Sequence, residues 1–117
     1  MSRTDPLPPS DLESEAALLG GLLTAHEYGD LANCDVDEIR AIVSPGAFYL
    51  PDHSRVFGEI CRAHEAGDPT DARAILARLQ GQDDKIDWTT LIDRLCVEAE
   101  PANAPFYARK VRECSQR

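Results

Sequence analysis

Cys61 and His64 are the first residues whose types and spacing could do chemistry. Positions i and i+3 share one face of a helix, and zinc accepts both thiolate and imidazole ligands. A closed zinc site needs further ligands, however, and no CxxC motif or second ligand pair lies near these two residues. Because Cys61 also falls on an apolar stripe, we expect a buried core thiol there, and we expect neither a metal nor another cofactor.

Other catalytic groups lack a recognisable arrangement. Nucleophilic catalysis needs a cysteine or serine within reach of a histidine and an orienting carboxylate, and no spacing in the chain shows such a set. Asp83 and Asp84, and likewise Glu13 and Glu15, are interpreted as solvated charges in a loop and at a helix end. The sequence therefore predicts no active site.

The composition limits the class of protein. The 117 residues suit one domain with a modest core. The β-branched residues do not alternate with polar ones, so the predicted fold class is all-α. No apolar run approaches the length of about 18 residues that a membrane helix needs. Without a signal peptide, the unpaired spacing of the four cysteines favours a reducing cytoplasm; they are Cys34, Cys61, Cys96 and Cys114.

The charge is distributed unevenly. The net charge is -9, yet the last twelve residues, 106–117, contain four basic residues and one acidic residue. An acidic body repels phosphate, so we expect no direct nucleic-acid binding. The basic residues are interpreted as cations near a helix C-terminus, with a DNA contact as the alternative; they are Arg109, Lys110, Arg112 and Arg117.

The first predicted helix spans about 11–26. Ser10 and Glu13 have the spacing of a capping box, in which each side chain bonds to the backbone N–H of the other residue. Leucines and alanines then recur on one face, while Glu13, Ser14 and Glu15 are expected to face solvent. The apolar stripe consists of Leu12, Ala16, Leu19 and Leu23, widened by Leu18 and Leu22.

Residues that start or end helices predict five more helices. Capping residues, prolines and glycines mark their ends, and the third helix is expected to be central. The second runs from Asp35, with Glu38 at capping-box spacing, to Pro45; the third from Pro51 to Gly67; the fourth from Asp71 to Gly81; the fifth from Asp87 to no later than Pro101; the sixth from about Asn103 onward. Polar residues around Gly29 and Asn33, and the segment 82–86, are predicted loops.

His53 is expected to orient a turn through a hydrogen bond, with a pH switch or ligand as the alternative.

Several short motifs occur along the chain in an order that is typical of one family. Besides the opening segment from Pro8 to Leu23, they are Phe48-Tyr49, Pro51, His53, Val56-Phe57 with Ile60, Gly67-Asp68-Pro69-Thr70-Asp71, Leu79, Pro101 with Asn103, Tyr107-Ala108-Arg109 and Val111-Arg112-Glu113. With these motifs the chain resembles the N-terminal domain of the DnaB-type replicative helicases over nearly its whole length. The resemblance implies a compact orthogonal bundle of about six helices, with residues 1–9 as a tail and 10–117 as the helical domain.

The resemblance also implies a function. In that family the domain forms a collar on the hexamer and takes part in docking the C-terminal domain of primase. The motor domain is not expected in this chain, because neither Lys85 nor Lys110 follows the glycine that a Walker A loop requires. The family's last helix continues into a long hairpin, most of which is expected to be absent because this sequence stops at Arg117. The stretch from about Ala25 to Asp37 is expected to be longer than the family's usual connection.

The expected role is therefore that of a non-catalytic interaction domain, with helicase subunits and primase as partners. Its candidate partner surface consists of Trp88, Tyr107, Arg109 and Arg112. Trp88 is either a half-exposed anchor or a core residue. One alternative is a stand-alone module that competes for helicase or primase. A second is a thiol- or zinc-dependent enzyme or regulator that uses Cys61, His64 and another cysteine.

Overall fold

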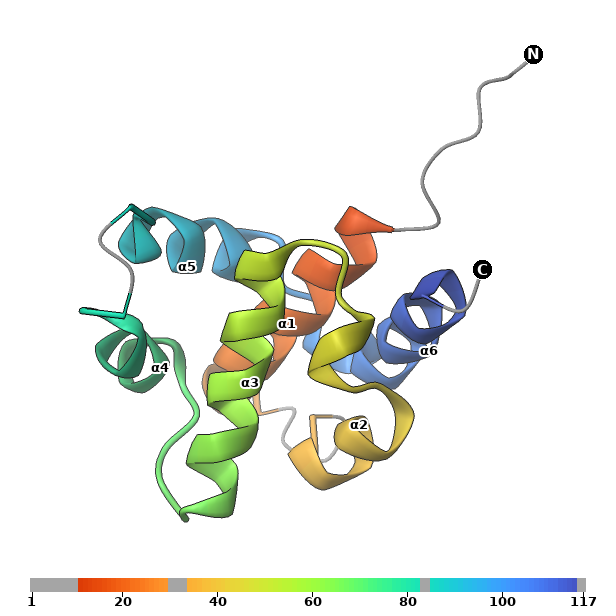
Figure 1. Cartoon of the computed structure of the whole chain (residues 1–117). Coiled ribbons are helices and arrows are strands. Elements are labelled where there is room, and N and C mark those ends of the chain that lie inside the picture. Colours follow the sequence, from red (N-terminus) through yellow and green to blue (C-terminus); the bar gives the residue numbers. More distant parts are fainter. Residues whose placement is uncertain (1–10, 30–33, 83–84, 116–117) are drawn as a thin grey trace.

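The computed structural model describes residues 11–29, 34–82 and 85–115. This part of the chain contains six α-helices, two 3-10 turns and no β-strand, so the all-α prediction is confirmed (Figure 1). The elements are α1 (Leu12–Tyr28), α2 (Val36–Ile42), the turn η1 (Pro45–Ala47), α3 (Pro51–Glu65), α4 (Ala72–Leu79), α5 (Trp88–Val97), the turn η2 (Pro101–Asn103) and α6 (Ala104–Ser115).

The central helix is α1, which contacts α3, α4, α5, α6 and η2 (Figure 1). From Ser14 to Ala25 every residue except half-buried Ala16 is buried. The expectation that the third helix is central was wrong. The physical reason is that between Ser14 and Ala25 every side chain of α1 except that of Glu15 is small or apolar, on all sides rather than on one stripe, which is typical of an enclosed helix.

Two glycines let the C-terminal part of the chain approach α1 closely. A Cβ atom on Gly20 would lie 1.9 Å from the carbonyl oxygen of Leu95, and one on Gly21 would lie 3.1 Å from the Cα of Pro101. Near this contact the N–H of Glu100 donates to the carbonyl oxygen of Ala17 at 3.3 Å. The backbone of α5 and η2 therefore packs directly on the backbone of α1.

Aspartates stand at the N-cap of four of the described helices, and three of them cap through the side chain; the fourth, Asp71 before α4, forms no side-chain cap hydrogen bond. Asp11 caps α1 by accepting a hydrogen bond from the N–H of Ser14 at 3.1 Å. The predicted cap was Ser10, which lies outside the described residues; Asp11 takes this role one position later, and aspartate is an equally good N-cap. The predicted caps Asp35 and Asp87 are confirmed, although Asp35 accepts from the N–H of Asp37 instead of pairing reciprocally with Glu38.

The C-terminal end of α3 is fixed by Gly67, as predicted. Its φ angle is 76°, and its N–H donates to the carbonyl oxygen of His64 at 3.1 Å. The N–H of Asp68 donates to the carbonyl oxygen of Ala63 at 2.8 Å, which completes a Schellman motif. At the end of α1, Gly29 has a φ angle of 71°, so the helix extends two residues past the predicted end. Asn33, Asp83 and Asp84 lie outside the described residues, as does part of the connection that was expected to be long.

Candidate interaction surface

Glu15 and His53 form a buried polar pair between α1 and α3. The side chain of Glu15 is only 2% exposed, and its Oε1 atom lies 2.8 Å from Nδ1 of His53. Its second oxygen accepts the N–H of Tyr49 at 2.6 Å. His53 forms the expected kind of hydrogen bond, but its partner is Glu15 on α1, and the turn itself is held by Glu15 through the N–H of Tyr49. The expectation that Ser14 and Glu15 face solvent was wrong, because both are buried: the start of α3 and the turn before it cover Glu15, and Ser14 lies on the side of α1 that faces α5 and α6.

This pair positions the turn that precedes α3. Tyr49, held through its backbone, has a side chain that is 54% exposed. The next residue, Leu50, lines a pocket of about 320 Å³ between α1, the start of α3 and the last turns of α5. The pocket is lined by Leu12, Glu13, Ala16, Leu50, His53, Arg94, Leu95 and Glu98. A buried acid thus fixes the rim of a mainly apolar surface pocket.

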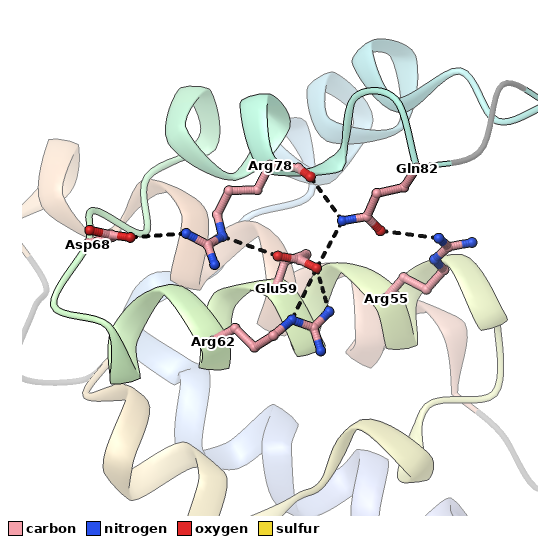
Figure 2. A network of polar contacts seen from close by, with 6 residues as sticks. All are labelled: Arg55, Glu59, Arg62, Asp68, Arg78 and Gln82. Carbon is pink, nitrogen blue, oxygen red and sulfur yellow. Dashed lines mark hydrogen bonds and ion pairs between the residues drawn. The ribbon is translucent and has the colours of Figure 1, made fainter.

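A second buried carboxylate, Glu59, is the centre of the polar network in Figure 2. Its oxygens accept hydrogen bonds from Arg62, from Nε of Arg78 at 3.1 Å and from Nε2 of Gln82 at 3.0 Å. Burial opposes the ionisation of Glu59, but the hydrogen bonds from Arg62, Gln82 and Arg78 outweigh it and lower the pKa to about 2. The saturated carboxylate therefore joins α3 to α4 and the residues after α4, and it is not free for acid–base chemistry.

Cys61 and His64 contact different partners. The Cys61 thiol is buried on the core side of α3, and burial raises its pKa, so it stays protonated near neutral pH. The Nε2 atom of His64 lies 3.1 Å from a carboxylate oxygen of Asp37 on α2. Within the described ranges, no group of three or more His, Cys, Asp or Glu side chains is placed to hold a metal ion. The geometry therefore offers no support for the thiol- or zinc-dependent alternative.

Trp88 belongs to the core. It is only 3% exposed, and the guanidinium of Arg55 lies 5.5 Å from the centroid of its ring. Its indole Nε1 atom is buried without a hydrogen-bond partner. The alternative of a half-exposed anchor is thus wrong for the isolated domain, since Trp88 opens α5 on the face that packs inward beside Leu91, Ile92 and Leu95.

The other three predicted surface residues lie on α6. This helix buries Ala104, Ala108 and Val111, spaced at i, i+4 and i+7, and it packs against α1 and α2. Arg109 is exposed, whereas Tyr107 and Arg112 are half-buried. Among the described residues neither arginine forms an ion pair. The structure therefore brings these three side chains onto one helix and separates them from Trp88.

Sequence reasoning missed two exposed apolar residues, Val97 and Phe106, and it wrongly placed Leu12, which is 42% exposed, on the packed stripe of the first helix. Phe106 is 48% exposed on the first turn of α6, and Val97 is 83% exposed at the last residue of α5. No local pattern distinguishes them from core residues, because their exposure depends on where α5 ends and how η2 turns the chain.

Within the part that the structure describes, no helix has the combined length and apolar character required to cross a bilayer.

The sequence model of the family described as the DnaB-like helicase N-terminal domain matches residues 7–113. The chain belongs to this family. The crystal structure of the N-terminal domain of DnaB helicase from Mycobacterium tuberculosis is similar, with a TM-score of 0.80 and 29% sequence identity. The match covers 94% of this chain and 77% of that one.

Curated relatives named replicative DNA helicase DnaB extend the comparison. The protein from Mycobacterium leprae is 31% identical over 110 residues, which are 91% of this chain and 17% of that protein. The protein from Geobacillus stearothermophilus is 28% identical over 113 residues, or 93% of this chain and 23% of that protein. The one from Nostoc sp. is 29% identical over 97 residues, or 75% of this chain and 10% of that protein. The chain thus spans less than a quarter of the length of these relatives.

Proposed function

We propose that this domain is a non-catalytic interaction module of a replicative DNA helicase, which contributes to assembly of the hexamer collar and docks the C-terminal domain of primase. Its membership in the DnaB N-terminal family and the replicative helicases among its relatives support this role. A cytoplasmic location belongs to the same proposal. Helicase subunits and primase are the proposed partners.

The outer face of α6 is the proposed contact surface, and its exposed arginine is the observation that carries the proposal. Arg109 projects from a helix whose opposite side is fixed in the core by Ala104, Ala108 and Val111. Since no acidic side chain in the described part of the chain pairs with Arg109, its guanidinium is available to a partner carboxylate. Arg and Tyr are also the residue types that interfaces favour.

The net charge argues that the partner is a protein and not DNA. The whole chain carries a charge of -9, and phosphate binding needs several cations that are not offset by neighbouring acids. On α6, Glu113 lies one residue from Arg112, so the helix offers only a small net positive charge. An arginine face of this size suits an acidic protein surface.

The molar mass in solution tests the proposal directly. Light scattering on size-exclusion fractions is measured for the full chain alone and mixed with the cognate primase C-terminal domain. A dimer or higher oligomer of the free chain supports the collar role, and a complex with primase supports the docking role. A free monomer that forms a one-to-one complex favours a recruiting or competing module. A monomer that binds nothing contradicts both roles.

Charge reversal on α6 then tests the surface. Arg109→Glu, and the double change with Arg112→Glu, should abolish self-association or primase binding. Arg73→Glu is the matched control, because Arg73 is an exposed arginine on α4 and undergoes the same change of charge. If the α6 variants bind as well as the control does, the α6 surface is the wrong one.

A further inference from the structure

A groove of about 430 Å³ lies where the first turn of α1, the end of α5 and the first turn of α6 meet. Its lining includes the two exposed apolar residues Val97 and Phe106. Leu12, which is 42% exposed, lies beside it on α1 and lines the adjacent pocket. Leu12, Val97 and Phe106 are three of the four large exposed apolar side chains in the described residues, the other being Tyr49. Exposed apolar surface is therefore concentrated at this end of the molecule.

The two hollows form one surface. Glu13 and Glu98 line both the groove and the adjacent pocket of about 320 Å³, so they stand on the ridge between them. The pocket adds further apolar lining from Leu50 and Leu95. An elongated ligand could thus contact Leu12 on one side of this ridge and Val97 and Phe106 on the other.

Carboxylates surround the apolar residues of the groove. They are Asp11, Glu13, Glu98 and Glu100, and none of them forms an ion pair within the described ranges. The single cation that lines the groove itself, Lys110, lies 6.0 Å from the centroid of the Phe106 ring, and the adjacent pocket adds Arg94. The helix dipoles do not add to this charge, because α5 presents its negative end here whereas α1 and α6 present their positive ends, and the acidic character comes from the carboxylates. The electrostatic character of the groove is therefore acidic.

An apolar strip bordered by acids is complementary to an amphipathic helix with basic flanks. We propose that this groove binds such a helix from another protein. Apolar side chains of the helix would contact Val97 and Phe106, and its lysines or arginines would pair with Glu13, Glu98 and Glu100. The site differs from the proposed α6 surface, since only Tyr107 belongs to both. Either surface can therefore fail without the other.

The probe is a synthetic helical peptide with leucines at i, i+3, i+4 and i+7 and lysines at the flanking positions. Titration of the full ¹⁵N-labelled chain should give saturable amide shifts at Val97, Glu98 and Phe106. A second peptide with the same leucines and glutamate in place of lysine should give no shift, because its charges repel the rim. A third, with the lysines kept and serine in place of leucine, separates apolar from purely electrostatic binding and should bind at least about tenfold more weakly.

Exposed positions allow variants that leave the core intact. Phe106→Ser should weaken binding of the lysine peptide by about tenfold or more, because it removes the largest apolar contact. Glu98→Lys should weaken it similarly. Glu38→Lys is the matched control, since Glu38 is an exposed acid on α2 away from the groove, and its affinity should stay within about twofold of the unmodified chain.

Three results would overturn the proposal. One is a set of shifts that maps outside the groove, and another is equal affinity of the lysine and glutamate peptides. The third is movement of the Val97 and Phe106 amides when the free protein is diluted, which would assign the groove to a second copy of the chain. The Arg109 variants provide the separate check on α6, because they should leave peptide binding unchanged.

Discussion

The carboxylate of Glu15 and the imidazole of His53 lie 2.8 Å apart in the interior, although 38 residues separate them in the sequence. The same carboxylate holds the backbone of Tyr49. One acidic side chain on α1 thereby fixes both the first turn of α3 and the exposed turn that precedes it. The rim of the apolar pocket depends on this contact.

Removing that acid should destabilise the domain. Glu15→Ala leaves the ring nitrogen of His53 and the N–H of Tyr49 buried without their acceptor, so we expect the free energy of unfolding to fall by about 3 kcal/mol. Urea denaturation measures the change. Glu13→Ala, an exposed acid two residues earlier, is the control and should change stability by no more than about 0.5 kcal/mol. Equal effects of the two substitutions would show that the buried pair contributes nothing.

Two glycine substitutions should have opposite effects. Gly20→Ala places a Cβ atom 1.9 Å from the carbonyl oxygen of Leu95, so α5 must move and we expect a loss of about 2 kcal/mol or more. Gly58→Ala is the matched control on α3, where the nearest atom is the Arg62 side chain at 3.7 Å. It should stabilise the domain by about 0.5–1 kcal/mol, because alanine is the better helix former. Thermal denaturation measures the stability of both variants against the unmodified chain. A Gly20→Ala protein as stable as the unmodified chain would contradict the close backbone contact.

The network around Glu59 should make stability fall in acid. The folded-state pKa of about 2 lies below the ordinary value of 4.5, so ionised Glu59 stabilises the fold above about pH 4.5, and this contribution is lost as the pH falls towards 2. Because solvent reaches Arg62, whose side chain is 60% exposed, we expect only about 1–2 kcal/mol.

Glu59→Gln is the informative variant for this network. It should be less stable than the unmodified chain at pH 6, and the difference should shrink at pH 3. Urea denaturation at both pH values measures it. A constant difference between the two proteins would mean that the charge of Glu59 is not what stabilises α4 on α3.

Trp88 should report on the core by its fluorescence. It is the only tryptophan in the chain and is 3% exposed, so its emission should be blue-shifted and poorly quenched by iodide in the native state. Unfolding should shift the emission to the red. Trp88→Ala should cost about 3–5 kcal/mol through the cavity it leaves. Strong iodide quenching of the native protein would instead show that Trp88 is exposed to solvent, as a surface anchor would be.

Local features of the fold were predictable, whereas contacts between distant segments were not. Asp35, Asp87 and Gly67 act on the backbone within a few residues, so their spacing was sufficient to place helix ends. The burial of Glu15 depends on a histidine on another helix, which helical periodicity cannot reveal. The same holds for the central position of α1, since a count of apolar residues on one face presumes a helix that lies at the surface.

The candidate surfaces divide in the same way. Arg109 was named through the family resemblance, and its exposure agrees with its position opposite the small apolar residues of its own helix. The exposure of Val97 and Phe106 could not be predicted, since each lies at a helix end whose direction is set by η2 and by the packing of Pro101 against Gly21. Trp88 opens a helix just as an exposed anchor could, and only the packing of α5 places it inside.

The enclosure of α1 has a consequence for biosynthesis. Translation makes α1 before the other helices described here, yet the segments that cover it include Leu95, Pro101 and α6, which come later in the sequence. Short helices are marginal in water without tertiary packing. The first helix therefore gains its full burial only after the ribosome has released nearly the whole domain, and until then its leucines are exposed to chaperones.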